Sequence, residues 1–320
     1  MTSEFDLIAR YFTRPTPHAT LGVGDDAALL RVSPGMELAI STDMLVSGTH
    51  FLPDTDPRKL GWKTLAVNIS DLAAMGAQPR WATLALALPD ADEAWLAAFA
   101  DGFFKCADCY GVELVGGDTT RGPLSLSVTI LGEVPQQQAL RRDAARAGDD
   151  IWVSGTLGGA ALGLAALQKR AALEETDLTH CLRALETPQP RVALGLALRG
   201  IAHAAIDISD GLLADLGHIL ERSGGGAEIY FAELPRPATV DAVLATAWGR
   251  HCLLAGGDDY ELCFTAEPGQ RAAIAALSQS LPLPLPLTRI GSIVAALGLR
   301  VLDAQGQPMA IEETGYDHFA

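Results

Sequence analysis

Aspartates that stand beside glycine, serine or threonine recur along this chain, at the ends of apolar runs or the starts of helical patterns. They occur in six stretches: GVGDDAALL (22–30), STD (41–43), NISDLAAMG (68–76), GGDTTRG (116–122), DISDGLLADLG (207–217) and GGDDYEL (256–262). Small residues at a strand end let the main chain approach a phosphate closely, and a carboxylate there can share a divalent cation with that phosphate. The pattern predicts a site for a phosphorylated ligand and its metal ions.

A second interpretation stays open, in which the aspartates never meet and each is an ordinary turn or cap residue. The two interpretations differ in the charge that they imply. Five or six aspartates around a nucleotide of roughly −4 and a second phosphate of about −2 would hold about −11. Each like-charge contact at ~4 Å costs on the order of 4 kcal/mol at an effective dielectric of 20. If the aspartates converge, several Mg²⁺ ions must join them.

Other motifs for phosphate or acyl chemistry are missing from the sequence. No GxxxxGK[ST] loop, no protein-kinase motif set and no GxSxG elbow occurs. The glycine-rich turn around 155–163 follows a predicted strand, but it lacks the GxGxxG spacing of a dinucleotide fingerprint, so close helix packing explains its glycines as well. Scattered aspartates and oxygen-loving cations therefore remain the main chemical signal.

Composition limits the class of protein. The chain has 320 residues, 49% of them hydrophobic, and a formal net charge of −16. That length suits two globular domains, and we place their boundary in the polar segment 135–150, giving domains of 1–136 and 137–320. The negative charge, with no basic stripe, argues against nucleic acid as a partner.

Neither a leader segment nor an apolar run of ~18 residues is present, so we expect a cytoplasmic protein with no membrane span. Five cysteines are an odd number, and the CxxC of Cys106 and Cys109 falls inside a helical pattern without a second pair. We interpret the cysteines as buried or incidental thiols.

The elements that would position the aspartates follow from periodicity. We expect strands at 28–32, 37–42 and 80–89, a helix from Asp56 or Pro57 to Gly76, and a capped helix at 90–111. In the second half we expect strands before Asp207, a strand-turn-strand at 253–266 and an extended edge segment at 281–291. Alternating strands and helices indicate an α/β protein, with a mixed sheet in the first domain.

Seven stretches together carry a resemblance to a known family. They are GVGDDAALL, ISTDMLVSGTHF, NISDLAAMGAQP, LVGGDTTRGPLS, IDISDGL, GGDDYEL and GYDHFA, and they span nearly the whole chain in order. The set resembles the thiamine-monophosphate kinase family of the PurM-like ATP-binding superfamily. The resemblance implies a two-domain PurM-like α/β fold, a homodimer whose N-terminal sheets pack together, and transfer of the γ-phosphoryl group of ATP to thiamine monophosphate.

The resemblance also implies roles for individual residues. Mg²⁺ ligands would be Asp26, Ser41, Thr42, Asp43, Asp71, Asp118, Asp207 and Asp210. ATP contacts would be Gly117, Asp118, Arg142 and Ser209, with Tyr110 near the adenine. Substrate contacts would be His50, Asp258 and Tyr316, and catalysis would depend most on Asp43, Asp118 and Arg142.

One position departs from the family pattern. Family members often carry GGEDYEL where this chain has GGDDYEL, so the carboxylate of Asp258 is one methylene shorter. Two other substrate assignments have structural alternatives: Tyr316 as a packed C-terminal anchor and His50 as a loop-packing histidine. Two rival functions also stay open, an aminoimidazole ribonucleotide synthetase within the superfamily and a non-catalytic nucleotide- or cation-binding protein.

Overall fold

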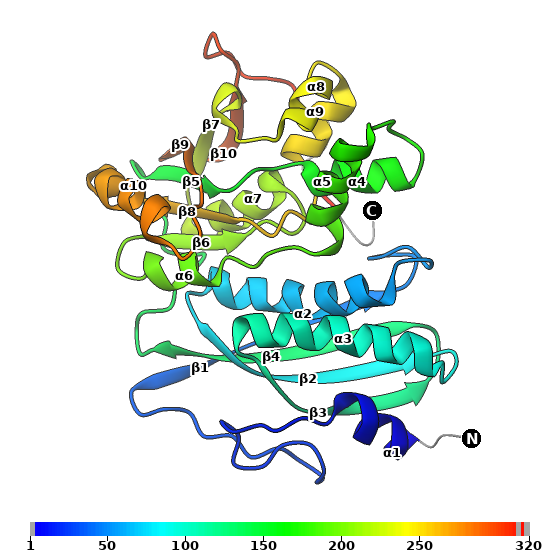
Figure 1. Ribbon diagram of the computed structural model, residues 1–320. Coiled ribbons are helices and arrows are strands. Elements are labelled where there is room, and N and C mark those ends of the chain that lie inside the picture. The colour runs from blue at the N-terminus through cyan, green and yellow to red at the C-terminus, as the bar shows by residue number, and fades with distance from the viewer. Residues whose placement is uncertain (1–3, 312–314, 317–320) are drawn as a thin grey trace. The chain divides into compact units, whose positions relative to one another are not determined.

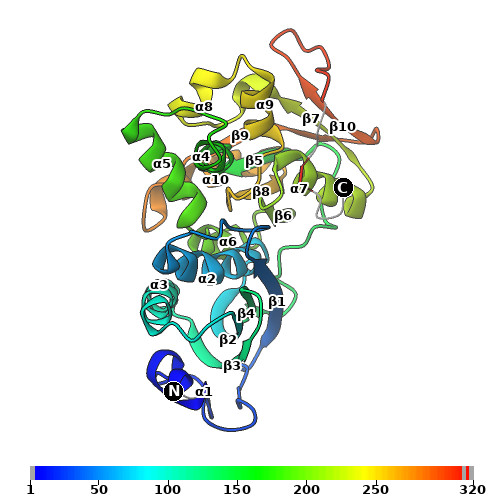
Figure 2. The ribbon, with the colours of Figure 1, turned by 90° about the vertical axis from the view of Figure 1, so that its right-hand side faces the viewer.

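The computed structural model describes residues 4–311 and 315–316. Contacts between Cα atoms divide the chain into two compact units (Figures 1 and 2). Unit 1 comprises Met1–Leu72 and Ala77–Gln137, and unit 2 comprises Ala73–Gly76 and Gln138–Ala320. The two sheets and their helices confirm the predicted α/β class.

Unit 1 is built on a four-stranded mixed sheet in the order β1-β4-β2-β3. The strands are β1 (Met36–Val46), β2 (Gln78–Leu88), β3 (Glu113–Arg121) and β4 (Ser125–Pro135). Strands β2 and β3 run parallel, whereas β4 is antiparallel to both β1 and β2. The helices α2 (Pro57–Ala74) and α3 (Glu93–Tyr110) lie on one face of this sheet (Figure 1).

The two long helices of unit 1 pack closely because glycines stand at their contact. A Cβ atom on Gly61 would lie 2.0 Å from the carbonyl oxygen of Phe99, and one on Gly102 would lie 1.8 Å from that of Arg58. The N-cap of α3 is Asp92, whose side chain accepts hydrogen bonds from two backbone amides. The predicted helices at 56–76 and 90–111 are confirmed.

The N-terminal part of unit 1 is less regular than the sequence predicts. Short helices α1 (Glu4–Leu7) and η1 (Ile8–Phe12) precede a segment with isolated bridges. The expected strand at 28–32 is wrong, because only Leu29 in this segment pairs, in a single bridge with Leu21. The apolar run ALLRV therefore forms an irregular segment with one bridge, not a ladder of hydrogen bonds.

Unit 2 contains a six-stranded sheet in the order β10-β7-β9-β5-β8-β6. Its strands are β5 (Asp150–Ser154), β6 (Ala204–Asp207), β7 (Gly226–Tyr230), β8 (Leu262–Ala266), β9 (Leu287–Val294) and β10 (Gly298–Leu302). Its helices are α4 (Gly159–Leu167), α5 (Glu175–Glu186), α6 (Val192–Leu198), α7 (Leu212–Ser223), η2 (Phe231–Glu233), α8 (Ala238–Val243), α9 (Ala247–Leu254), η3 (Pro268–Gln270) and α10 (Arg271–Ser280). Strands β5 and β8 are completely buried.

Two expectations for unit 2 need correction. The segment 281–291 is not an edge: β9 begins at Leu287, after the last of the alternating prolines, and lies between β7 and β5. The segment 253–266 is helix-turn-strand, because Leu253 and Leu254 end α9. In both cases a short apolar run fitted more than one environment, and tertiary packing selected among them.

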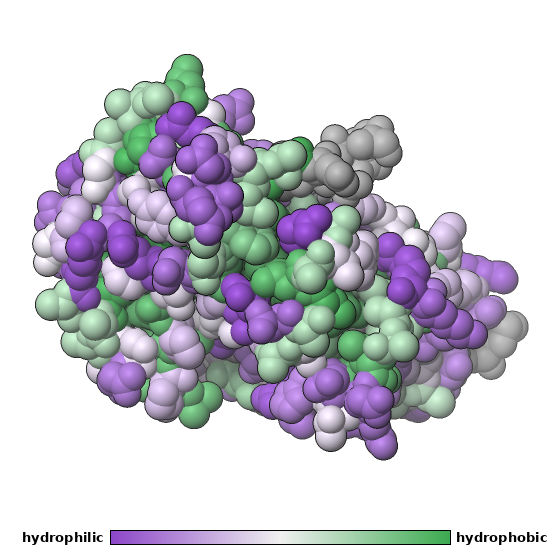
Figure 3. Space-filling view, turned by 90° about the horizontal axis from the view of Figure 1, so that it is seen from above, coloured by the Kyte–Doolittle hydropathy of each residue, from purple (hydrophilic) through white to green (hydrophobic). Residues whose placement is uncertain are grey.

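Among the described residues, no helix has the length and apolar character needed to cross a membrane. Hydrophilic and hydrophobic residues are interspersed over the face of the molecule shown in Figure 3.

A buried carboxylate at the start of β5 gives the stability of this fold a pH dependence. Asp150 is 3% exposed in its side chain and accepts hydrogen bonds from Arg271 Nε at 2.6 Å and Nη2 at 2.7 Å. These hydrogen bonds lower the pKa of Asp150 although burial opposes them, and Arg289 contributes further. Because the folded-state pKa lies below the unfolded value of about 3.9, the stabilisation is present above that pH and lost as the pH falls.

We expect Asp150→Asn to lower the free energy of unfolding at pH 7 by about 2 to 3 kcal/mol and to reduce its fall between about pH 5 and pH 3. Urea denaturation of the full chain at several pH values measures both effects. The control is Asp241→Asn, because Asp241 pairs with Arg236 at the surface and should cost less than about 1 kcal/mol. An unchanged pH dependence in Asp150→Asn would contradict this assignment.

Candidate active site

Ser41 and Asp71 form the firmest contact among the predicted site residues of unit 1. Ser41 on β1 donates a hydrogen bond from Oγ to Asp71 Oδ2 on α2, at 2.5 Å. Asp43, two residues further along the strand, shares this face of β1, and its backbone N–H donates to Asn68 Oδ1 at 3.0 Å. The β1 and α2 elements thus bring a hydroxyl and two carboxylate-bearing residues to one side of the sheet.

Thr42 belongs to the opposite face of β1. Its Oγ1 lies 2.9 Å from Oγ1 of Thr129 on the neighbouring strand β4, and the residue is exposed. Successive side chains of a strand point to opposite faces. A cation held by the side chains of Ser41 and Asp43 would therefore not be held by the side chain of Thr42.

Gly117 and Asp118 lie on β3, at the far edge of the sheet from β1. The φ of Gly117 is +153°, and a Cβ atom there would lie 1.9 Å from the carbonyl oxygen of Leu84, so only glycine fits. In the ladder, Asp43 pairs with Val128, Val128 with Leu84 and Leu84 with Gly117. Three strand spacings separate the backbones of Asp43 and Gly117, which is about 14 Å.

Three other predicted residues of unit 1 have identified surroundings. The Nδ1 of His50 accepts a hydrogen bond from the Val46 backbone N–H at 3.0 Å, so a neutral ring carries its proton on Nε2. The ring of Tyr110 meets Trp62 edge to face, with centroids 6.4 Å apart. Asp26 is exposed and donates its backbone N–H to Asp25.

In unit 2 the strand β6 ends at Asp207, which is 3% exposed, and the loop that follows leads into α7. One carboxylate oxygen of Asp215, in the first turn of α7, accepts hydrogen bonds from the backbone N–H groups of Ser209, Asp210 and Gly211 at 3.0, 3.0 and 3.2 Å. Burial, together with the nearby Asp210, raises the pKa of Asp215 to about 7 although these three hydrogen bonds oppose the shift.

The GGDDYEL segment lies directly against this loop. The N–H of Asp258 donates to the carbonyl oxygen of Ser209 at 2.8 Å, the N–H of Tyr260 to that of Ile208 at 2.8 Å, and the N–H of Ile208 to that of Glu261 at 2.8 Å. Asp258 and Tyr260 both have positive φ, +70° and +49°. Positive φ is unfavourable for residues other than glycine, so these two residues indicate local backbone strain, which the surrounding hydrogen bonds compensate.

Two predicted substrate residues, Asp258 and Tyr316, adjoin the β6–α7 loop of unit 2. The hydroxyl of Tyr260 donates to Asp258 Oδ1 at 3.2 Å and so orients this carboxylate. The backbone N–H of Tyr316 donates to the carbonyl oxygen of Asp210 at 3.1 Å, and its side chain is exposed. Unit 2 therefore gathers Ser209, Asp210, Asp258 and Tyr316 in one hydrogen-bonded group.

Three residues next to this group, Glu261, Arg191 and Ser154, were not predicted from the sequence. Glu261 is 4% exposed and is bonded by both Nε and Nη2 of Arg191, and by Ser154 Oγ at 2.5 Å. Glu261 stands inside the quoted GGDDYEL motif, which was the available signal, whereas Arg191 and Ser154 come from distant parts of the sequence. Arg142, by contrast, is exposed, and its carbonyl oxygen accepts from Ser223 Oγ at 2.9 Å.

No three His, Cys, Asp or Glu side chains surround a common point in the part of the chain that the structure describes. The metal ligands named from the sequence therefore stay predictions.

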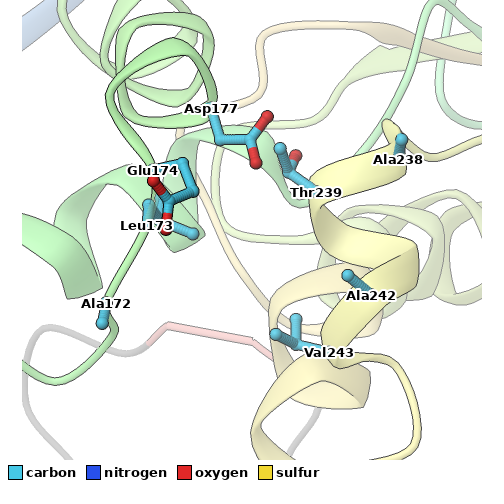
Figure 4. Close-up of a pocket in the computed structure, with 8 residues that line it drawn as sticks. All are labelled: Ala172, Leu173, Glu174, Asp177, Ala238, Thr239, Ala242 and Val243. Carbon is cyan, nitrogen blue, oxygen red and sulfur yellow. The ribbon is translucent and has the colours of Figure 1, made fainter.

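A pocket of about 310 Å³ lies between the beginning of α5 and α8 (Figure 4). Its lining consists of Ala172, Leu173, Glu174, Asp177, Ala238, Thr239, Ala242 and Val243. None of the residues named from the sequence lines this pocket.

Comparisons with known proteins identify the family. Residues 24–134 match the N-terminal domain model of AIR synthase related proteins, and residues 146–303 match the C-terminal domain model. The thiamine-monophosphate kinase of Salmonella typhimurium is 49% identical over 327 residues, covering 99% of this chain and 98% of its own length.

Solved structures give the same result. The crystal structure of thiamine-monophosphate kinase from Stenotrophomonas maltophilia is 52% identical, covers 95% of each chain and has a TM-score of 0.85. AaThiL complexed with AMPPCP and TMP is 31% identical, covers 90% of this chain and 89% of its own, and has a TM-score of 0.78. The chain thus belongs to the AIR synthase related proteins and, among them, to the thiamine-monophosphate kinase family.

Proposed function

We propose that this protein transfers the γ-phosphoryl group of ATP to thiamine monophosphate and so forms thiamine diphosphate. The observation that carries the proposal is the hydrogen-bonded group in unit 2. There the loop with Ser209, predicted to contact ATP, and Asp210, predicted to bind Mg²⁺, is joined by hydrogen bonds to Asp258 and Tyr316, which are predicted to contact the substrate. The relative AaThiL, complexed with AMPPCP and TMP, supports the same pair of ligands.

We propose Mg²⁺ as the cation for this chemistry, because hydroxyl and carboxylate oxygens are its preferred ligands. Ser41 and Asp71 are hydrogen-bonded to each other, and Asp43 shares this face of β1. A cation there would be held by the carboxylates of Asp43 and Asp71 and by the hydroxyl oxygen of Ser41, which would keep its proton. Further ligands would be Asp26 and Asp118 in unit 1, and Asp207 and Asp210 in unit 2. The side chain of Thr42 lies on the opposite face of β1, so we leave it out of this ligand set. Bound Mg²⁺ supplies positive charge that offsets the repulsion between the two phosphate groups.

The substrate side of the proposal depends on a cationic ring. The Asp258 carboxylate, oriented by Tyr260, would face the thiazolium, and the exposed ring of Tyr316 would offer a cation–π contact. The Nε2–H of His50 would donate to the phosphate of thiamine monophosphate. Tyr110 and Gly117 would lie at the nucleotide.

The transfer needs no general base, because the acceptor phosphate oxygen is already ionised near neutral pH. We propose direct in-line transfer in which Asp43 and Asp118 hold the cations and Arg142 neutralises charge on the transferred group. Incubation with γ-labelled ATP should leave no label on the protein. A labelled aspartyl phosphate would contradict direct transfer.

The function itself is tested with a coupled assay for ADP. Thiamine monophosphate, thiamine and the aminoimidazole precursor are compared side by side as co-substrates, with and without Mg²⁺. We expect release of ADP only with thiamine monophosphate and Mg²⁺. Equal release with the aminoimidazole precursor, or none with any acceptor, would contradict the proposal.

We also propose a homodimer formed through unit 1, supported by the exposed apolar residues of the edge strand β1. Leu38, Ile40 and Met44 are 40%, 58% and 55% exposed and alternate along the face opposite α2. Native edge strands with such side chains are normally covered. Domain limits of 1–136 and 137–320 and a cytoplasmic location complete the proposal.

A charge on this strand should separate the dimer. We expect wild-type protein to sediment as a dimer and Ile40→Asp to sediment as a monomer, because a carboxylate would be buried without a partner. The control is Leu297→Asp, which changes an exposed leucine in the turn between β9 and β10 of unit 2. A wild-type monomer, or a dimer in both variants, would contradict this interface.

A further inference from the structure

The backbone of the loop between β6 and α7 is saturated with internal hydrogen bonds. The N–H groups of Ser209, Asp210 and Gly211 all donate to the same oxygen of Asp215. The three carbonyl oxygens of the same residues accept from the N–H groups of Asp258, Tyr316 and Asp215, at 2.8, 3.1 and 3.0 Å. All six main-chain groups of the segment thus have partners within unit 2.

Three backbone N–H groups that converge at the start of a helix form an anion-binding nest. In many nucleotide-binding proteins such a nest holds a phosphate. Here the nest contains the carboxylate of Asp215, which is 3% exposed. The side chain reaches back because Cα–Cβ bonds of a helix tilt toward its N-terminus.

The beginning of α4 repeats this arrangement. The N–H of Gly158 donates to Asp259 Oδ2 at 2.8 Å, and Ala160 contributes a second backbone hydrogen bond. Burial raises the pKa of Asp259 well above its usual value. At the start of two helices of unit 2, backbone N–H groups thus donate to carboxylates of the chain itself, three groups at α7 and two at α4.

We propose that Asp215 is a positioning residue for the phosphoryl transfer proposed above. Its carboxylate fills the nest before α7 and fixes the conformation of the loop. Only the side chains of Ser209 and Asp210 are then available to the nucleotide and the cation. This inference rests on the proposed function of that loop. It implies that the N-terminus of α7 does not bind phosphate through its amides. Contact with the phosphates there is made by side chains and by the cations that they hold.

The loop has little room to hold this shape in another way. Gly211 has φ of +116°, and a Cβ atom there would lie 2.7 Å from the carbonyl carbon and oxygen of Ala255. Without the Asp215 carboxylate, three N–H groups would lose their acceptor at once. The loop would then rearrange toward water or toward an anion from solution.

The test uses the full-length Asp215→Ala and Asp215→Asn proteins. By amide hydrogen exchange, we expect Ser209, Asp210 and Gly211 to exchange at least about tenfold faster in Asp215→Ala, and less so in Asp215→Asn, which keeps an acceptor oxygen. In the ADP assay we expect the Mg²⁺ concentration for half-maximal rate to rise about 10- to 100-fold in Asp215→Ala. Added formate should restore part of the rate, because it can occupy the emptied nest, whereas chloride should not.

The matched control is Asp149→Ala. Like Asp215, Asp149 is 3% exposed and accepts a hydrogen bond from a backbone N–H, that of Arg146, at 2.9 Å. Unlike Asp215, it does not contact the β6–α7 loop through this hydrogen bond, because it directly precedes β5. It should lower stability while leaving the exchange at residues 209–211 and the Mg²⁺ dependence unchanged. The positioning role is wrong if Asp215→Ala lowers stability but matches Asp149→Ala in the three other measurements. These are amide exchange at residues 209–211, the Mg²⁺ dependence of the rate and the effect of formate on the rate. If wild-type protein does not phosphorylate thiamine monophosphate, the proposed function fails, but amide exchange still tests the geometry.

Discussion

Asp43→Ala should lower the rate of thiamine monophosphate phosphorylation by at least about a thousandfold while the protein stays folded. Asp43 is half-buried on β1, beside the hydrogen-bonded pair of Ser41 and Asp71. Its backbone N–H is anchored to Asn68 through an amide hydrogen that the substitution does not remove. The change therefore takes away a proposed cation ligand and leaves the contact between β1 and α2 in place. The measurement is the steady-state rate of ADP release at saturating Mg²⁺, with circular dichroism to verify folding.

The matched control for this variant is Glu37→Ala. Glu37 is an exposed carboxylate on the same strand and the same face, six residues away, so it reproduces the loss of one negative charge. We expect its rate to stay within about twofold of wild type. A rate for Asp43→Ala within tenfold of wild type would remove Asp43 from the proposed metal site.

Among the variants proposed for this protein, Arg191→Ala should lower the free energy of unfolding most. Its guanidinium forms two hydrogen bonds to Glu261, whose side chain is only 6% exposed. The substitution would leave that carboxylate buried without a guanidinium partner, although Ser154 would still donate to it, which costs about 3 to 5 kcal/mol. We expect the free energy of unfolding to fall by this amount and the Tm to fall by about 10 °C. Urea and thermal denaturation of the full chain measure both.

A second variant separates the unpaired charge from lost packing. Combining Arg191→Met with Glu261→Gln removes both charges, so it should recover more than half of the stability lost in Arg191→Ala. Arg300→Ala is the surface control, because its pair with Glu228 is exposed and worth less than about 1 kcal/mol. A loss below 1 kcal/mol in Arg191→Ala would show that the buried pair contributes little.

Helix start signals explain which helices could be predicted from the sequence. The helix from Pro57 and the helix capped by Asp92 carry apolar residues at helical spacing and clear start signals, and both are present. The run ALLRV and the prolines before Leu287 carry no such long-range information. Whether an apolar run pairs, and whether a strand is central or at an edge, depends on partners that are far away in sequence.

Some residues of the candidate site could also be predicted from the sequence, and others could not. Motifs identified Ser209, Asp210 and Asp258 as chemically interesting, and the structure joins their segments by hydrogen bonds. The motif STD grouped Thr42 with Ser41, although successive side chains of the predicted strand 37–42 point to opposite faces, and the structure places Thr42 against Thr129. The motifs could not assign Asp215, since a helical aspartate is usually a solvated face residue and only coordinates show three N–H groups converging on it.

The most direct measurement is a crystal structure of the protein with a non-hydrolysable ATP analogue, thiamine monophosphate and Mn²⁺ in place of Mg²⁺, with anomalous scattering used to locate the cations. We predict anomalous peaks in direct contact with the carboxylates of Asp43 and Asp71, and with those of Asp207 or Asp210, each also touching a phosphate oxygen. Bound nucleotide and substrate with no cation at any of these carboxylates would contradict the proposal.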